Sequence, residues 1–119
     1  MEKFENLRVW QIAKDLAVRI YKLVQTTSIS KDYGFKDQIQ RSAVSIASNI
    51  AEGDDSGSDK LSIRYFNIAK GSAAELITQI IIANEIGYIN DQTRSEITNE
   101  CDRISAMLAK LIKSRSHQV

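Results

Sequence analysis

Apolar residues recur at intervals of three and four along most of the chain, and none of its 119 residues is a proline. Such intervals place the apolar side chains on one face of an α-helix, which takes 3.6 residues per turn. Proline is the residue that most strongly interrupts a helix interior, so its absence permits long helices throughout. No segment shows the strict alternation that indicates a strand. The sequence therefore predicts an all-α protein.

Turn-forming segments at 26–32, 53–59 and 87–90 divide this pattern into four parts. Glycine readily adopts the left-handed conformation that ends helices, and Ser, Asp and Asn favour turns and helix amino-terminal caps. We expect helices over about 7–25, 34–53, 60–86 and 91–113. Short connections favour antiparallel neighbours, so residues 1–119 should form one domain, an antiparallel up-down-up-down four-helix bundle.

Single residues are expected to mark several helix ends. Gly53 should end the second helix and Gly87 the third, because a glycine adopts the required backbone conformation without steric cost. Asn90 or Asp91 should cap the fourth helix, since either side chain can accept a hydrogen bond from a free backbone N–H.

The third helix carries more apolar surface than one core requires. Its apolar positions spread over about 260° of the helical projection, whereas a single core needs a stripe of about 100° or somewhat more. Ile77, Ile81 and Ile82 flank the inward-facing Leu76 and Ile80. Such a cluster left in water would promote aggregation, so we expect another copy of the chain to cover those three isoleucines. The alternative is a helix that is simply central in its own bundle.

Charge and cysteine content limit the partners and the compartment. Sixteen basic and fifteen acidic side chains give a net charge of +1, so no strong global field attracts nucleic acid or membranes. No segment is apolar enough to span a bilayer, and the first residues lack the apolar stretch of a signal peptide. The only cysteine, Cys101, excludes an internal disulfide and favours a reducing compartment, the cytoplasm.

The residues that usually carry chemistry are absent or isolated. The only histidine, His117, lies in the predicted carboxyl-terminal tail, so no helix offers the Glu-x-x-His spacing of di-iron bundles. Cys101 lies in an apolar stripe without a histidine nearby in sequence. The acidic loop 54–59 lacks the glycine and the closing glutamate of a calcium loop, and no Gly-rich phosphate loop is present. We expect no enzymatic activity, no metal, no cofactor and no small-molecule substrate.

A polar stripe runs along the second helix. Arg41, Ser45, Ser48 and Glu52 follow one another at intervals of four, three and four, with Asn49 beside them. In one interpretation the stripe binds a partner, with Arg41 meeting the phosphates of RNA. In the other, the same groups satisfy one another across helices or subunits and set the register between them. We favour this second, structural interpretation.

The third helix carries two further candidate features. Gly71 and Ser72 place small side chains at its middle, where glycine costs about 1 kcal/mol relative to alanine, so we expect close helix packing there. Lys60 and Arg64, one turn apart, with Lys70 further along, form a candidate basic patch for phosphates. We favour solvated surface over phosphate binding for these three residues, because acids adjoin them.

Three ordered motifs resemble one known family. Residues 4–10, FENLRVW, look like the opening helix of that family, and residues 66–88 match a later segment in order and spacing. Residues 38–53, QIQRSAVSIASNIAEG, resemble its signature, in which Asn-Ile-Ala-Glu-Gly follows an arginine and a run of small residues. Over nearly its whole length the chain thus resembles the four-helix-bundle proteins encoded in intervening sequences of bacterial large-subunit ribosomal RNA genes, sometimes labelled ribosomal.

The resemblance implies a homo-oligomer, a pentameric ring of bundles, and an association with ribosomal RNA. A related branch comprises the accessory proteins of diversity-generating retroelements, in which a basic pentamer binds reverse transcriptase and nucleic acid. This near-neutral chain lacks that charge, and Gln40 precedes Arg41 where relatives often carry a second arginine, while Ala47 replaces a frequent proline. We expect RNA or an RNA-associated protein as the partner. The alternative is a protein-protein interaction scaffold or accessory subunit with no nucleic-acid binding.

Overall fold

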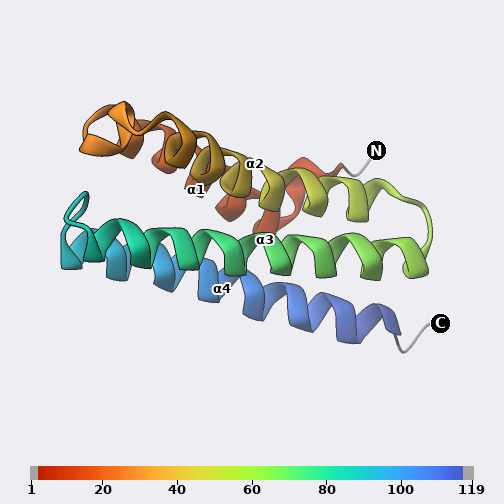
Figure 1. Ribbon diagram of the computed structural model, residues 1–119. Coiled ribbons are helices and arrows are strands. Elements are labelled where there is room, and N and C mark those ends of the chain that lie inside the picture. Colours follow the sequence, from red (N-terminus) through yellow and green to blue (C-terminus); the bar gives the residue numbers. More distant parts are fainter. Residues whose placement is uncertain (1–2, 117–119) are drawn as a thin grey trace.

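The computed structural model describes residues 3–116, which form four long α-helices and two short 3-10 helices. In chain order these are η1 (Phe4–Asn6), α1 (Arg8–Gln25), η2 (Ser28–Lys31), α2 (Tyr33–Asp55), α3 (Asp59–Glu85) and α4 (Asp91–Ser116). Successive long helices run in opposite directions and pack side by side (Figure 1). The predicted up-down-up-down bundle is confirmed, with helix ends within three residues of the expected positions.

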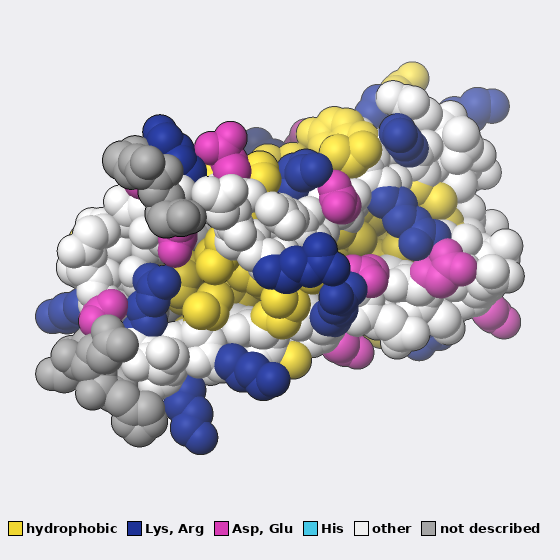
Figure 2. Space-filling view, turned by 180° about the vertical axis from the view of Figure 1, so that it is seen from behind, with side chains coloured by type: hydrophobic (Ala, Val, Ile, Leu, Met, Phe, Trp, Pro, Cys, Tyr) yellow, Lys and Arg dark blue, Asp and Glu magenta, His cyan; other side chains and the backbone are white. Residues whose placement is uncertain are grey.

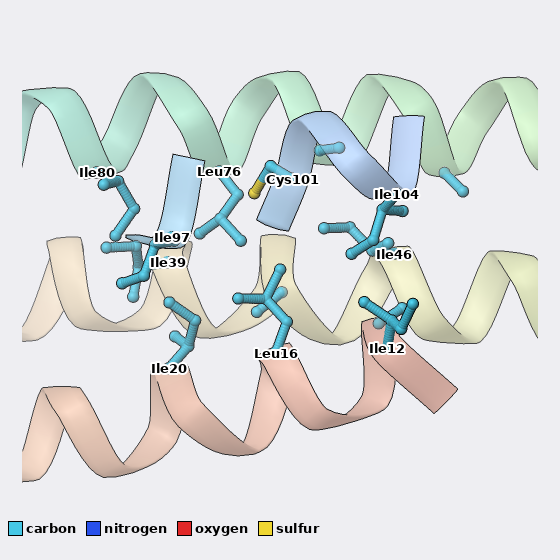
Figure 3. Close-up of a cluster of buried hydrophobic side chains, with 14 of the residues drawn as sticks. Ile12, Leu16, Ile20, Ile39, Ile46, Leu76, Ile80, Ile97, Cys101 and Ile104 are labelled. Atoms are coloured by element: carbon cyan, nitrogen blue, oxygen red, sulfur yellow. The ribbon is translucent and has the colours of Figure 1, made fainter. Parts of the chain in front are cut away.

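The core is a single apolar seam to which all four helices contribute. The stripes predicted from spacing face inward, and their central side chains meet across the bundle (Figure 3). Fully burying one Ile or Leu side chain stabilises the fold by about 1.5–3 kcal/mol. The side chains with no exposed surface include Ile20, Ile39, Ile46, Leu76, Ile80, Ile97, Ile104 and Leu108.

The turn between α3 and α4 forms as the sequence predicts. Gly87 has a φ of 86°, and Tyr88 N donates to Ala83 O at 2.8 Å, so the glycine ends α3 in the left-handed conformation. Between the two candidate caps of α4, the structure selects Asn90, whose Oδ1 accepts from Thr93 N at 2.8 Å. Asp91 instead accepts from the side chain of Asn84.

The expectation that Gly53 ends α2 is wrong. The helix continues to Asp55, and Gly53 is a buried helical residue whose lack of a side chain admits the ring of Phe66. A Cβ at Gly53 would lie 2.7 Å from a ring carbon of Phe66, closer than van der Waals contact allows. The chain turns instead at Gly57, with a φ of 78°, and Ser58 caps α3 by accepting from Leu61 N.

Polar contacts tie each end of the bundle across helices. At one end, the Tyr88 hydroxyl donates to the Asp32 carboxylate at 2.9 Å, and this hydrogen bond raises the pKa of Tyr88 above its usual value of 10.0. At the other end, Arg115 donates to Ser62 Oγ at 2.8 Å and lies over the Phe66 ring, 5.2 Å from its centroid. None of the described helices could cross a membrane, because none combines sufficient length with sufficient apolar character.

Candidate interaction surfaces

The polar stripe lies on the outward side of α2, and the edge of the stripe nearer α3 forms a hydrogen bond to that helix. Ser45 Oγ lies 2.8 Å from Ser72 Oγ across the two helices. Asn49 donates to both the backbone oxygen and the hydroxyl of Ser45, at 2.9 and 3.0 Å. All three side chains are at least half-buried, and each has its hydrogen-bond partner inside the chain. These groups therefore link α2 to α3, as the structural interpretation of the stripe expects.

The other members of the stripe point elsewhere. Arg41 is exposed and pairs with Asp37, one turn away on the same helix, at 3.3 Å. Ser48 faces α1 rather than α3. Glu52 is exposed, and its side chain makes no ion pair or hydrogen bond with any other residue that the structure describes. Arg41 and Glu52 lie about 16 Å apart along the helix axis, so the structure does not gather the five residues into one site.

A polar groove of about 390 Å³ opens between α2 and α3 beside this hydrogen-bonded edge. Gln79 Oε1 is buried within residues 3–116 without a hydrogen-bond partner there. Arg41 and Glu75 supply opposite charges to the lining, and the groove contains no histidine or cysteine that could act as a nucleophile or base. The lining residues are Gln38, Arg41, Ser42, Ser45, Ser72, Glu75 and Gln79.

The candidate basic patch on α3 is not brought together. Lys60 and Arg64 are exposed and lie one turn apart. Lys70 follows Arg64 by six residues, which places it about 120° away around the helix axis, and it is half-buried. The three cations therefore do not share one face of the helix.

The close helix packing expected at Gly71 is not made within one chain. Gly71 is exposed on the outward face of α3, and a Cβ added there would meet nothing within 4 Å. Ser72 is buried and contacts α2 through Ser45. The close approach lies at Gly53 instead, because that residue is the one opposite a core aromatic ring.

The candidate interface residues of α3 differ in exposure. Ile77 is half-buried against the core and Ile81 is half-buried, whereas Ile82 is 45% exposed. Ile82 belongs to a larger outward set whose spacings of 7, 14 and 4 residues keep its members on one face of the helix. We call this set the α3 ridge, and it comprises Leu61, Ile68, Ile82 and Ile86, which are 43–55% exposed.

An apolar groove of about 590 Å³ lies between α1 and α2, and the sequence did not predict it. Its small residues, Ala17, Ala47 and Ala51, leave a hollow between larger side chains. Phe4 and Trp10 meet edge to face at one end, with ring centroids 5.2 Å apart. We call this surface the α1/α2 groove, and it is lined by Phe4, Trp10, Lys14, Ala17, Val18, Tyr21, Lys22, Val44, Ala47, Ser48 and Ala51.

A signal for the α1/α2 groove was present in the sequence. Val18 and Val44 lie outside the apolar stripes of their helices, and Tyr21 occupies the border of its stripe. In the structure these three side chains are 42–46% exposed. Apolar residues that miss the core stripe on two neighbouring helices can indicate a second apolar surface.

The side of the molecule turned away from the viewer in Figure 1 is shown in Figure 2. It exposes apolar atoms along the seam between α1 and α4, with lysines and arginines around them. Two hollows of about 320 and 300 Å³ lie on this seam. Arg19 pairs with Glu96, whose pKa is lowered chiefly by that hydrogen bond, and Arg103 pairs with Glu100 at 3.8 Å. These carboxylates reduce the positive potential that the face presents.

Two features bear on metal binding and thiol chemistry in residues 3–116. No three His, Cys, Asp or Glu side chains there are grouped to hold a metal ion. Cys101 is fully buried, and this burial raises the pKa of its thiol from 9.0 to about 12, so at neutral pH it is a protonated core residue. His117 lies outside the described residues.

Comparison with known proteins identifies relatives of the whole bundle. A search of the curated proteins found no match. A crystal structure from Bacteroides thetaiotaomicron VPI-5482, described as a protein with unknown function from the S23 ribosomal protein family, superimposes with a TM-score of 0.80 at 29% identity. The match covers 88% of this chain and 98% of that one. The profile of the 23S rRNA-intervening sequence proteins matches residues 5–110. The chain therefore belongs to the 23S rRNA-intervening sequence protein family.

Proposed function

We propose that this chain is a non-enzymatic scaffold of the cytoplasm that assembles with copies of itself and associates with RNA. The proposal of self-assembly rests on one observation. Of the eight large hydrophobic side chains that the structure describes as exposed, seven lie on two surfaces: four on the α3 ridge and three in the α1/α2 groove. Exposed apolar residues scattered singly are ordinary, but two concentrated surfaces favour contact with another macromolecule.

The choice of RNA as partner rests on the family and on the face shown in Figure 2. Members of the family are named for intervening sequences of 23S ribosomal RNA. Arg8 and Lys110 line the seam between α1 and α4, and neither makes an ion pair with another described residue. An assembly repeats these cations once per copy, so that each chain's small charge is multiplied where several copies meet one RNA.

The residues of the polar groove and Cys101 support the non-enzymatic part of the proposal. The polar groove between α2 and α3 combines hydroxyls and amides with a single arginine and a single glutamate. A nucleophile would need a neighbouring base, and neither Ser45 nor Ser72 contacts one: their hydroxyls contact each other. The buried thiol of Cys101 is protonated at neutral pH.

Two measurements test the proposal. Light scattering on the untagged protein should give a mass several times the 13.4 kDa of one chain. A labelled RNA transcribed from a bacterial 23S intervening sequence should bind the assembly, with an affinity that falls steeply as salt is added, because phosphate contacts release counterions. A monomer with no affinity for this RNA at low salt would contradict the proposal.

A second candidate function is a protein-interaction scaffold that binds no nucleic acid. It is favoured by the pairing of four arginines, Arg19, Arg41, Arg103 and Arg115, with carboxylates of the same chain. An oligomer that binds the labelled RNA at no salt concentration would support this candidate and remove RNA from the proposal.

A further inference from the structure

We propose that the α1/α2 groove of one copy receives the carboxyl-terminal half of the α3 ridge of a second copy. The proposal rests on the self-assembly proposed above and names its two contact surfaces. They share no residue and lie on different helices, so the contact joins unlike surfaces. Each contact leaves a free groove on one copy and a free ridge on the other.

The shapes of the two surfaces are complementary. Ile82 and Ile86 project from α3 one turn apart, at 45% and 55% exposure. The groove offers a hollow above Ala17 and Ala47, where a larger side chain would fill the space between the helices. From Trp10 to Lys22 the groove runs about 18 Å along α1, which accommodates about three turns of a docked helix. The segment 75–86 of α3 has about that length.

Charge selects the carboxyl-terminal half of the ridge. Lys14 and Lys22 are the charged residues of the groove lining. Lys14 pairs with Asp15 at 2.6 Å, whereas Lys22 forms no ion pair within residues 3–116. Glu75 and Glu85 accompany Ile82 on the exposed side of α3, and neither forms an ion pair within residues 3–116. In the proposed contact, Lys22 of the groove thus meets the glutamates beside the ridge.

The amino-terminal half of the ridge fits the groove less well. Leu61 and Ile68 are as exposed as Ile82, but Lys60 and Arg64 lie beside them. Docking this half would bring those cations toward the lysines of the groove, and like charges oppose such a contact. The two halves of the ridge therefore supply a matched internal control.

The test uses one charged variant on each surface. Val44→Glu alters the groove and Ile82→Glu alters the ridge, and both positions are exposed enough to leave helicity by circular dichroism unchanged. Each variant alone should lose the assembly and scatter light as a 13.4 kDa monomer. An equimolar mixture should give a dimer, because one variant keeps an intact ridge and the other an intact groove. Ile68→Glu should retain the wild-type mass.

A covalent measurement covers the case in which a glutamate variant fails to fold. Chains carrying Val44→Cys are mixed with chains carrying Ile82→Cys under mild oxidation. A disulfide between the two kinds of chain is expected in at least tenfold excess over either like pair. The native Cys101 is buried and does not compete.

The outcomes separate this inference from the proposed function. If wild type assembles, Ile82→Glu is monomeric and Val44→Glu keeps the wild-type mass, ridges contact ridges, and the inference fails while self-assembly stands. Two monomeric variants that give no dimer when mixed and no mixed disulfide would also overturn it. A monomeric wild type would remove both.

Discussion

The two flanks of α2 meet their neighbours in opposite ways. Toward α3, hydrogen bonds among Ser45, Asn49 and Ser72 close the contact, and Gly53 admits an aromatic ring. Toward α1, small and apolar side chains leave a groove of about 590 Å³ open. Hydrogen bonds are directional and fix the register of two helices, whereas apolar attraction is non-directional and can be satisfied by any apolar partner. The flank toward α3 is therefore closed by directional bonds, and the flank toward α1 leaves an apolar groove exposed.

The largest expected effect is on the free energy of unfolding, and it is tested by truncating one side chain from each flank. Phe66→Ala removes a fully buried ring from the closed flank and should lower the free energy of unfolding by about 3–5 kcal/mol. Val44→Ala in the groove should lower it by less than about 1 kcal/mol, because Val44 is 42% exposed. Urea denaturation followed by circular dichroism measures both. Equal losses would contradict the contrast between the flanks.

The two helical glycines provide the next test. Gly53→Ala forces a methyl group against Phe66 and should destabilise the protein by about 1–3 kcal/mol. Gly71→Ala adds its methyl group to open space, and alanine is the better helix former, so it should stabilise the protein by up to about 1 kcal/mol. Thermal unfolding should move in opposite directions for the two variants. If Gly71→Ala instead lowers the stability of the monomer, a neighbour must pack closely against Gly71, and the prediction fails.

The hydrogen bond between Ser45 and Ser72 is open to a double-mutant cycle. Each single change to alanine should cost about 1 kcal/mol, because it leaves the other hydroxyl without this partner. Because both changes remove the same hydrogen bond, the double variant should lose less stability than the sum of the two single losses. Ser48→Ala, on the groove side of α2, should change the stability by less than about 0.5 kcal/mol. Strictly additive losses would show that the two hydroxyls do not interact.

The smallest effect at neutral pH concerns Cys101. Burial raises its pKa to about 12 in the folded state, so the unfolded chain releases this proton first as the pH rises. The contribution of Cys101 to stability is therefore full below the ordinary thiol pKa of 9.0 and declines above it. A shallower decline above pH 9 for Cys101→Ala would support this assignment.

Reactivity at pH 8 compares the core with the groove. In folded protein Cys101 should react with a thiol reagent only slowly, and a cysteine introduced as Val44→Cys should react at once. Rapid modification of Cys101 in the folded wild type would place it outside the core.

Much of the fold was predictable because helix formation is largely local. Spacing alone identified the inward faces, and Ile20, Ile39, Leu76 and Ile104 are all fully buried. The turn at Gly87 was predictable for the same reason, since its left-handed conformation depends on its own backbone. The error at Gly53 is instructive: a glycine beside polar residues indicates a turn locally, but this one is required by a ring 13 residues later.

The candidate surfaces were less accessible to sequence reasoning. Arg41, Ser45, Ser48 and Glu52 do share one face of α2, yet spacing could not reveal that neighbouring helices divide that face between a bonded edge and a groove edge. The excess apolar surface of α3 was visible, but its most exposed positions, Ile82 and Ile86, could be separated from Ile77 only by seeing which flank α4 covers.

By itself, the sequence determined four amphipathic helices, their antiparallel order, their inward faces and the family. Each of these depends on the periodicity and composition of short segments, which tertiary contacts seldom override in long helices. Only the tertiary structure decided which glycine lies at a close approach, which polar groups satisfy one another, and which apolar surfaces stay uncovered. Those outcomes depend on the rotation and separation of whole helices, quantities that arise when four faces pack into one core at once.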